Sequence, residues 1–536
     1  MNLLATATYD AQTHLFLADH YARGWFEGWE PRWFGGFWVY SYPPLVHQLV
    51  ALGGHLELAY QLVQLATLIL LPASVWLLAR EVAGLEAAGW AAWLTALSAG
   101  PLMCLYVFGQ LPTIAGMALM FGAGAFLLRF LRSGHRWDLA TWGCLAAAAL
   151  ATHHLTGLGA FPFLMLAAFV QSVGETPRSL QGRAVLRCVL AGAVAGLLSS
   201  LVLAPFVWWF STGGSPQAEI PHPSRTNFFL RPDHAFLFFG GIWGASLPVL
   251  LASLWSLRSR PGVWPWAALV LLWGVLGLGS LTPLPRWLFP NWHHWLTYER
   301  FTLWAATLSA LPAGVWLAGL RSRPMMGAVL GAFVLAGGWS ATCSARAWIL
   351  PPPLEGTVLR EVARYLDSRK EYRYITIGLA ENDLARVSRS TVASTVDGLY
   401  YTARRDPYLR ASGVGALDTA QWQSPQARWV QRSVLSRPQA FGLGSGVAAT
   451  SYGEAEFEAA GWVRVARVGA EGTHPPEDLR PFRVSLWRVP GRNLQAPPSG
   501  HPAVPAWFAA VWGVAPLASL LLGGVGVVVS LRRGTV

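Results

Sequence analysis

The feature that most constrains this chain is a series of apolar stretches, each close to the length at which a helix crosses a lipid bilayer. Such a helix needs about 20 mostly apolar residues, and the 536-residue chain holds eleven candidates. Charged side chains make up only 12% of it, about half the fraction usual in soluble proteins. These features exclude an ordinary soluble enzyme and predict an α-helical polytopic membrane protein. The predicted spans lie near 59–79, 85–107, 112–131, 139–152, 157–173, 187–209, 234–256, 263–282, 301–320, 326–348 and 505–531.

Arginine residues in alternate loops predict how these helices are oriented. By the positive-inside rule, the loops that carry them face the cytoplasm. The other loops are longer, aromatic and histidine-bearing, and we expect them on the extracytoplasmic side: 1–58, 108–111, 153–156, 210–233, 283–300 and 350–502. The C-terminus is then cytoplasmic and Met1 is extracytoplasmic. This arrangement favours a first transmembrane helix missing ahead of Met1 over unaided translocation of the first polar segment.

Composition divides the chain into four segments. Residues 1–58 are a first extracytoplasmic loop with interfacial helices, and 59–349 are the transmembrane core, with a short break expected between the spans at 139–152 and 157–173. Residues 350–502 have proline-rich ends and mixed helical and strand-like patterns, which predict a small extracytoplasmic α/β domain. Residues 503–536 are a C-terminal transmembrane helix and a short cytoplasmic tail. The expected elements of the α/β domain are helices at 355–369 and 454–460 and strands at 372–378, 462–468 and 482–489.

The first extracytoplasmic loop holds the most informative polar residues. Asp10 and His14 are four residues apart, so they share one face of the helix predicted there. Tyr42-Pro43-Pro44-Leu45 follows, and its prolines stiffen the start of a helix at 45–53 that is too short to cross a membrane. Asp10 is equally consistent with the cap of a helix, which is a common position for aspartate.

A first outer loop that opens with an aspartate, continues as a helix and ends in a Tyr-Pro-Pro-Leu element resembles that of the GT-C superfamily of membrane glycosyltransferases. The order of elements over residues 9–350 is similar to that of bacterial and archaeal GT-C-like proteins described as 6-pyruvoyl-tetrahydropterin synthase-related. The resemblance implies a bacterial or archaeal plasma membrane, a polyprenyl-phosphate-linked sugar as donor and a glycan, lipid or protein as acceptor. It also implies that Asp10 is the general base for the acceptor hydroxyl and that Tyr42 contacts substrate.

The second extracytoplasmic loop departs from this family. Many members carry an acidic motif there, whereas this loop reads Phe108-Gly109-Gln110-Leu111-Pro112 and has no acid. The departure counts against metal-dependent catalysis. It favours an alternative, a non-catalytic GT-C-like scaffold or assembly partner in a membrane complex.

Two other segments carry polar residues at the ends of predicted spans. His153 and His154 lie between two short spans, where an imidazole either lines a cavity or satisfies an interrupted helix. Glu299 and Arg300 precede the next span. A guanidinium at that depth suits a lipid phosphate or diphosphate, although a local pair with Glu299 or interfacial anchoring would explain it as well. With His14, these four residues are the expected substrate contacts.

A cofactor is not required by the sequence. Asp10, His14, one of His153 and His154, and Glu299 have ligand types that suit a divalent metal such as zinc or manganese, but they come from distant segments. No phosphate-binding loop or nucleophile elbow is present, so ATP-driven transport and serine hydrolysis are poorly supported. Four acids of the predicted α/β domain indicate no site: Glu381, Asp383, Asp397 and Asp406.

With the resemblance, these observations predict an integral membrane glycosyltransferase of GT-C type, with Asp10 as base and Arg300 as phosphate clamp. Expected partners are membrane lipid, the lipid-linked sugar, the acceptor and, for a scaffold, another membrane protein. No basic stripe marks a polar segment, so nucleic acid is not expected. A lipid or polysaccharide transporter is a further alternative, but spans nearly free of ionisable groups count against ion coupling.

Overall fold

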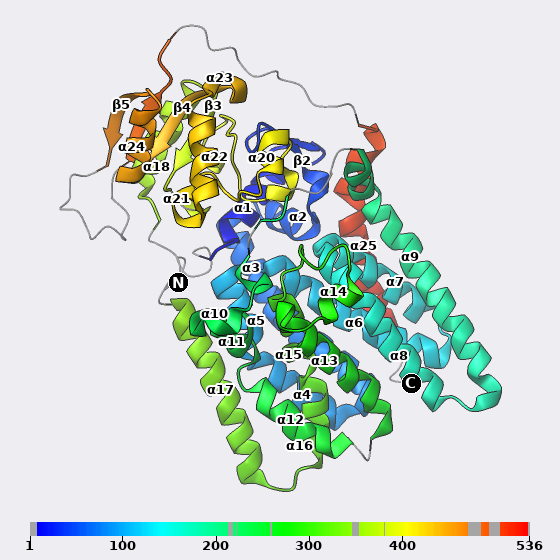
Figure 1. Ribbon diagram of the computed structural model, residues 1–536. Coiled ribbons are helices and arrows are strands. Elements are labelled where there is room, and N and C mark those ends of the chain that lie inside the picture. Colours follow the sequence, from blue (N-terminus) through cyan, green and yellow to red (C-terminus); the bar gives the residue numbers. More distant parts are fainter. Residues whose placement is uncertain are drawn as a thin grey trace. The chain divides into compact units, whose positions relative to one another are not determined.

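The computed structural model describes residues 8–212, 218–220, 222–257, 260–345, 353–379, 381–469, 484–491 and 504–533 (Figure 1). The chain divides into two compact units, each assembled from segments that are distant in the sequence. The membrane unit consists of residues 42–205, 222–346 and 510–536, and the α/β unit consists of residues 1–41, 206–221 and 347–509. The helix predicted ahead of Met1 lies outside the described residues.

The membrane unit supplies the helices that make this chain a polytopic membrane protein. Among the described residues, eight helical runs are long and apolar enough to cross a membrane. A ninth crossing arises if Pro232–Trp243 and Ser246–Trp255, which are bent by 51°, form one broken span. The eight runs are Leu56–Ala83, Leu85–Phe108, Leu111–Ser133, Thr156–Glu175, Arg178–Thr212, Glu299–Gly319, Arg323–Thr342 and Ala506–Arg533.

Each of the eleven predicted spans coincides with helix over its described residues, although two of these helices are short. α7 (Arg136–Thr152) has 17 residues, and the apolar helix Pro261–Gly277 is also shorter than a full span. The predicted break is present, because α7 ends at Thr152 and a π-helical turn, η3 (Thr156–Ala160), leads into α8 (Phe161–Glu175).

The membrane unit is made of long helices joined by short helical turns. Its longer helices are α3 (Leu56–Ala83), α4 (Leu85–Ala96), α6 (Leu111–Ser133), α9 (Gln181–Thr212), α12 (Ser246–Ser256), α13 (Trp264–Gly277), α15 (Glu299–Leu308), α16 (Ala310–Gly319), α17 (Arg323–Ala345) and α25 (Ala506–Arg533). Its short elements are α2 (Leu45–Ala51), α5 (Ala99–Met103), η2 (Cys104–Phe108), η4 (Arg178–Leu180), η5 (Pro223–Arg225), η6 (Phe228–Leu230), α10 (Pro232–Ala235), η7 (Phe236–Gly240), α11 (Gly241–Trp243), η9 (Pro261–Val263), η10 (Gly279–Leu281) and α14 (Leu284–Leu288). α9 and α25 each continue from one unit into the other.

A four-stranded mixed sheet forms the centre of the α/β unit (Figure 1). Its strand order is β3 (Arg373–Ile377), β4 (Leu443–Ala448), β6 (Val484–Arg488) and β5 (Val463–Val468). β3 and β4 are parallel, whereas β6 is antiparallel to both of its neighbours. Parallel strands are usually covered on both faces, and residues 374–377 of β3 are all buried.

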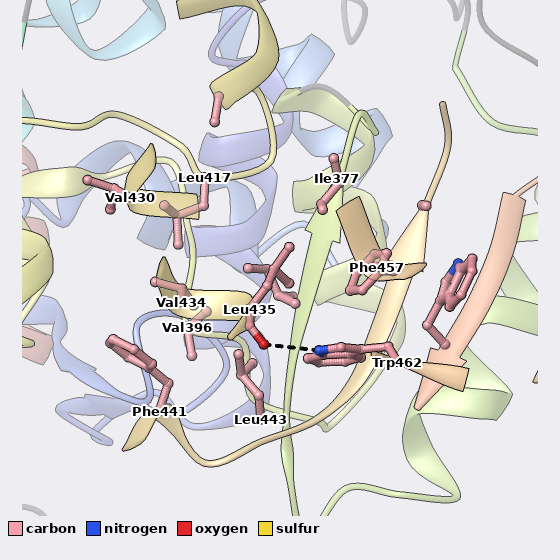
Figure 2. Close-up of a cluster of buried hydrophobic side chains, with 14 of the residues drawn as sticks. Ile377, Val396, Leu417, Val430, Val434, Leu435, Phe441, Leu443, Phe457 and Trp462 are labelled. Carbon is pink, nitrogen blue, oxygen red and sulfur yellow. Dashed lines mark hydrogen bonds between the residues drawn. The ribbon is translucent and has the colours of Figure 1, made fainter. Parts of the chain in front are cut away.

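Alternate side chains of β3 enter two separate hydrophobic cores, because successive residues of a strand point to opposite faces. Tyr374 packs with Val358 and Val362 of α18 (Gly356–Asp367). Ile377 belongs to the other core, which also holds Val430 and Val434 of α22 (Pro425–Leu435), as Figure 2 shows. Each element expected in this domain is present, including α24 (Ser451–Ala459).

The other elements of the α/β unit are short helices and a two-stranded ribbon. They are α1 (Ala11–Arg23), β1 (Trp29–Glu30), β2 (Phe37–Trp38), η1 (Val39–Ser41), α19 (Glu381–Ser390), η11 (Tyr401–Ala403), α20 (Pro407–Ala411), α21 (Ala420–Gln423) and α23 (Pro438–Phe441).

The first loop of the chain is an integral part of the α/β unit. The backbone N–H of Phe34 donates to Asp397 O (3.1 Å), and that of Gly35 donates to Thr395 O (2.9 Å). Thr395 N–H in turn donates to Arg32 O (2.8 Å). Gly35 has a φ of +69°, which glycine adopts without steric cost. The composition of the sequence separates residues 1–58 from 350–502, whereas in the fold residues 1–41 and 347–509 belong to one unit.

Candidate functional site

Asp10 lies at the N-terminus of α1 without capping it. Its side chain makes no capping hydrogen bond, whereas the Thr8 hydroxyl accepts the N–H of Ala11 at 3.2 Å. The capping interpretation of Asp10 is therefore wrong, and its side chain is half-buried. His14 follows one turn later and is only 3% exposed, and its backbone N–H donates to Asp10 O at 3.0 Å.

The neighbour of Asp10 is Glu381, the first residue of α19, which packs against α1. Burial and the nearby carboxylates of Asp10, Asp418 and Asp397 raise the pKa of Glu381 to about 7. The C-terminal end of α19 is also joined to α1, because Arg389 Nη1 donates to Gln12 Oε1 at 3.1 Å. No pattern in the sequence indicates this pair, since its members are 371 positions apart and neither belongs to a motif that contains the other.

The two acids behind Glu381 are held by their own partners. Arg404 is 2% exposed and donates from Nη2 to Asp397 Oδ1 at 3.2 Å. The other oxygen of Asp397 accepts the backbone N–H of Asp418 at 2.9 Å, and Asp418 Oδ1 accepts the N–H of Leu379 at 3.1 Å. These bonds fix the chain just before Glu381.

A second charged network holds the start of the first loop in place. Arg32 donates from Nη2 to Glu30 Oε2 (2.7 Å) and from Nε to Glu30 Oε1 (2.8 Å), and His20 Nδ1 lies 3.0 Å from Glu30 Oε2. Burial alone would raise the pKa of Glu30, but the hydrogen bonds from Arg32 and His20 lower it to about 2. Glu30 is therefore ionised at neutral pH, and it ties α1 to the ribbon strand β1.

In the membrane unit, Glu299 brings a carboxylate to the second predicted outer loop. Gln110 Nε2 donates to Glu299 Oε1 at 3.2 Å, and Glu299 and Gln110 are only 3% and 6% exposed. Within the described part of the chain, three buried polar atoms here have no hydrogen-bond partner: Glu299 Oε2, Gln110 Oε1 and Arg300 Nε. A polar atom in that state costs roughly 1–3 kcal/mol, so a polar group that bonded to these atoms would recover part of this cost.

His222 lies in the same electrostatic neighbourhood, although the sequence did not single it out. Burial lowers its pKa; the charge of Glu299 opposes this effect, and the charges of Arg225 and Arg300 add to it. Arg225 donates to two backbone carbonyls just before Glu299, Trp295 O at 3.0 Å and Leu296 O at 3.1 Å. The only sequence signal for His222 is its place in a histidine-bearing outer loop.

His153 serves the break between α7 and η3. Its Nδ1 accepts the N–H of Thr156 at 3.2 Å and lies 2.7 Å from the Thr156 hydroxyl. Its Nε2 lies 3.4 Å from Thr113 Oγ1, three residues beyond Gln110 on the first turn of α6. His153 and Glu299 are thus linked to the same helix end. These contacts support the interrupted-helix interpretation of His153, and its role as a substrate contact stays a prediction.

His154 and Tyr42 are the remaining predicted site residues, and each has its own local surroundings. His154 is half-buried beside His153, and the half-buried Tyr42 lies edge-to-face with His47, their ring centroids 5.4 Å apart. Asp10 and His14 belong to the α/β unit, whereas Tyr42, His153, His154, Glu299 and Arg300 belong to the membrane unit. In the described ranges, no group of three or more His, Cys, Asp or Glu side chains could hold a metal ion, and the divalent metal considered from the sequence stays a prediction.

Comparison with solved structures gives matches along most of the chain. ArnT from Cupriavidus metallidurans bound to undecaprenyl phosphate aligns with a TM-score of 0.55 and 13% identity, covering 92% of this chain and 97% of that one. The oligosaccharyltransferase of Archaeoglobus fulgidus in complex with zinc and sulfate aligns with a TM-score of 0.47 and 12% identity over 82% of this chain. This chain spans 64% of the length of that archaeal protein.

At the level of sequence, no family model and no curated protein matches this chain. The similarity to the solved structures is therefore a similarity of fold, and the roles of individual residues rest on their own geometry.

Proposed function

Because this chain has the fold of the GT-C membrane glycosyltransferases, we propose that it transfers a sugar from a polyprenyl-phosphate donor to an acceptor on the extracytoplasmic side of the membrane. ArnT binds undecaprenyl phosphate, and an archaeal oligosaccharyltransferase binds a dolichol-phosphate. A lipid-linked phosphate is the ligand class that these two proteins share. The acceptor of this chain is proposed only as a glycan, lipid or protein with a nucleophilic hydroxyl group.

The observation that carries this proposal is the set of unsatisfied polar atoms at the start of α15. Arg300 offers a guanidinium for phosphate oxygens, to which its planar donors are suited. Glu299 Oε2 and Gln110 Oε1 offer acceptors for hydroxyl groups of a sugar. A sugar phosphate needs both kinds of partner.

Asp10 is the proposed general base. Its carboxylate accepts the proton of the acceptor nucleophile as that atom bonds to C1 of the sugar and the bond from C1 to the phosphate oxygen breaks. The electron pair of the broken bond leaves with the polyprenyl phosphate, and Arg300 stabilises the charge that develops there. Glu381 keeps a second negative charge away from Asp10 whenever it holds its proton.

The scaffold alternative rests on the missing acid of the second loop. Glu299, bound to Gln110 of that loop, supplies a carboxylate at the same place and weakens this argument. A transporter would need charged groups within its spans, and the polar cluster described here lies at helix ends.

The test is transfer from a radiolabelled polyprenyl-phosphate sugar by the full chain reconstituted in lipid nanodiscs. Asp10→Asn is expected to abolish transfer while the protein stays monodisperse and keeps its thermal unfolding temperature. Asp233→Asn is a matched control, because Asp233 is an exposed acid paired with Arg231. Full activity of Asp10→Asn would refute its assignment as base. If the wild-type chain neither binds nor uses the donor, the transferase proposal is refuted and the scaffold alternative remains.

A further inference from the structure

A groove in the α/β unit lies apart from every residue assigned above. It runs between α22 and α24, has a volume of about 590 Å³ and is open to solvent. Ligand sites of small molecules usually measure about 300–1,000 Å³ and combine an aromatic wall with a few fixed polar groups. The groove has the size of such a site.

The two walls of the groove are rigid because one core holds both helices. Val430 and Val434 on the inner face of α22 pack in the same cluster as Phe457 of α24 (Figure 2). The indole N–H of Trp462, just after α24, donates to Leu435 O at the end of α22 at 3.1 Å. A site whose walls are fixed before binding loses little conformational entropy when a ligand binds.

One wall presents a flat aromatic surface and hydroxyl groups along a single helix face. Trp429, Arg432 and Ser433 of α22 and Ser436, its C-cap residue, line the groove, and their spacing of three, four and seven residues places them side by side. Trp429 is 63% exposed, a large apolar area left in water. On α24, the groove-lining residue Ala455 has only a methyl side chain, which leaves room opposite the indole.

The charges in the groove cancel and are held in a fixed orientation. Arg432 Nε donates to both oxygens of Glu456, at 2.9 and 2.8 Å, and Glu456 is 7% exposed. An anionic ligand such as a phosphate would need an unpaired cation, and a wholly apolar ligand would not need a charged pair. The pair presents donors and acceptors side by side, as vicinal hydroxyl groups require.

A sugar ring has both features that the groove complements, an apolar C–H face and a rim of hydroxyl groups. We propose that the groove between α22 and α24 binds an oligosaccharide, with one ring on the Trp429 indole and its hydroxyl groups on Arg432, Glu456 and Ser433. This binding needs neither donor nor transfer, so it goes beyond the proposed function.

The experiment is a calorimetric titration of the full chain with neutral hexasaccharides of glucose, mannose, galactose and N-acetylglucosamine. The chain is held in phosphatidylcholine nanodiscs, because many detergents carry sugar headgroups that would compete for the groove. At least one of the four is expected to bind. Trp429→Ala is expected to weaken that binding at least about tenfold, as aromatic anchors do, and Trp429→Phe to weaken it less. Trp422→Ala is the matched control, because Trp422 is also exposed (59%) but does not line the groove.

Asp10→Asn is expected to leave this affinity unchanged, which separates the groove from the transfer reaction. The proposal is overturned if none of the four sugars binds at millimolar concentration, or if Trp429→Ala and Trp422→Ala have equal effects. It is also overturned if Trp429→Ala abolishes binding to anionic phosphatidylglycerol vesicles while leaving sugar binding intact, because the groove would then be a lipid site.

Discussion

Replacement of Glu381 by glutamine should stabilise the protein at alkaline pH, since the native carboxyl is held in an unfavourable place for a charge. Burial and the acids Asp10, Asp418 and Asp397 raise its pKa from 4.5 to about 7 in the folded state. The folded chain therefore retains a proton that the unfolded chain releases. Stability from this group falls as pH rises from about 4.5 to about 7 and is constant outside that window.

The magnitude follows from the size of the shift. About 2.5 pKa units at 1.36 kcal/mol each give an upper bound of roughly 3 kcal/mol. Glu381 keeps part of its surface exposed, and solvent screening lowers this figure, so we expect at least about 1 kcal/mol. In a unit of this size, that corresponds to about 2–4 °C in the unfolding temperature.

The assay is the thermal unfolding temperature of the full chain in detergent between pH 4 and pH 8. The difference between Glu381→Gln and wild type should be near zero at pH 4 and should grow to its full value above pH 7. Glu371→Gln, at an exposed carboxylate, is the control for loss of charge. Asp10→Asn should flatten the wild-type curve in part, because Asp10 is one cause of the raised pKa. Parallel curves for Glu381→Gln and wild type would refute the raised pKa of Glu381, and an unchanged curve for Asp10→Asn would refute the proximity of the two acids.

Three further changes test the groups around this pair. Arg404→Met leaves Asp397 buried without its cation and should lower the free energy of unfolding by about 3–5 kcal/mol, which thermal unfolding measures. Adding Asp397→Asn should restore part of the loss, and a double variant no more stable than Arg404→Met would contradict the pairing. Glu30→Gln should destabilise the protein above pH 5 and have no effect near pH 2. The pKa of Glu30 is lowered from 4.5 to about 2 in the folded chain, so the stability that its charge contributes is lost as pH falls from about 4.5 to about 2. An effect of the substitution that does not depend on pH would count against the network. Arg300→Ala should raise the KM for the polyprenyl-phosphate donor at least about tenfold, with Arg300→Lys intermediate; an unchanged KM would remove Arg300 from the donor site.

The sequence by itself determined which stretches of this chain become helices in a membrane. Apolar runs interrupted by charged loops form a one-dimensional signal, because each spanning helix satisfies its own backbone hydrogen bonds within one segment. The same local reasoning found α18, β3, α24, β5 and β6, where residue patterns repeat with the period of the element itself. It also found the break after α7, which two histidines marked.

The tertiary structure decided which of the sparse charges meet. Asp10 meets Glu381 only because α1 packs on α19, and the pairing of residues 32–35 with 395–397 that holds the first loop there is made by backbone groups, which have no residue signature. Glu299 similarly reaches Gln110 across 189 positions, so a loop that reads as lacking an acid acquires one from another helix. Contacts between distant segments depend on packing between whole elements, and no period within a single segment encodes them.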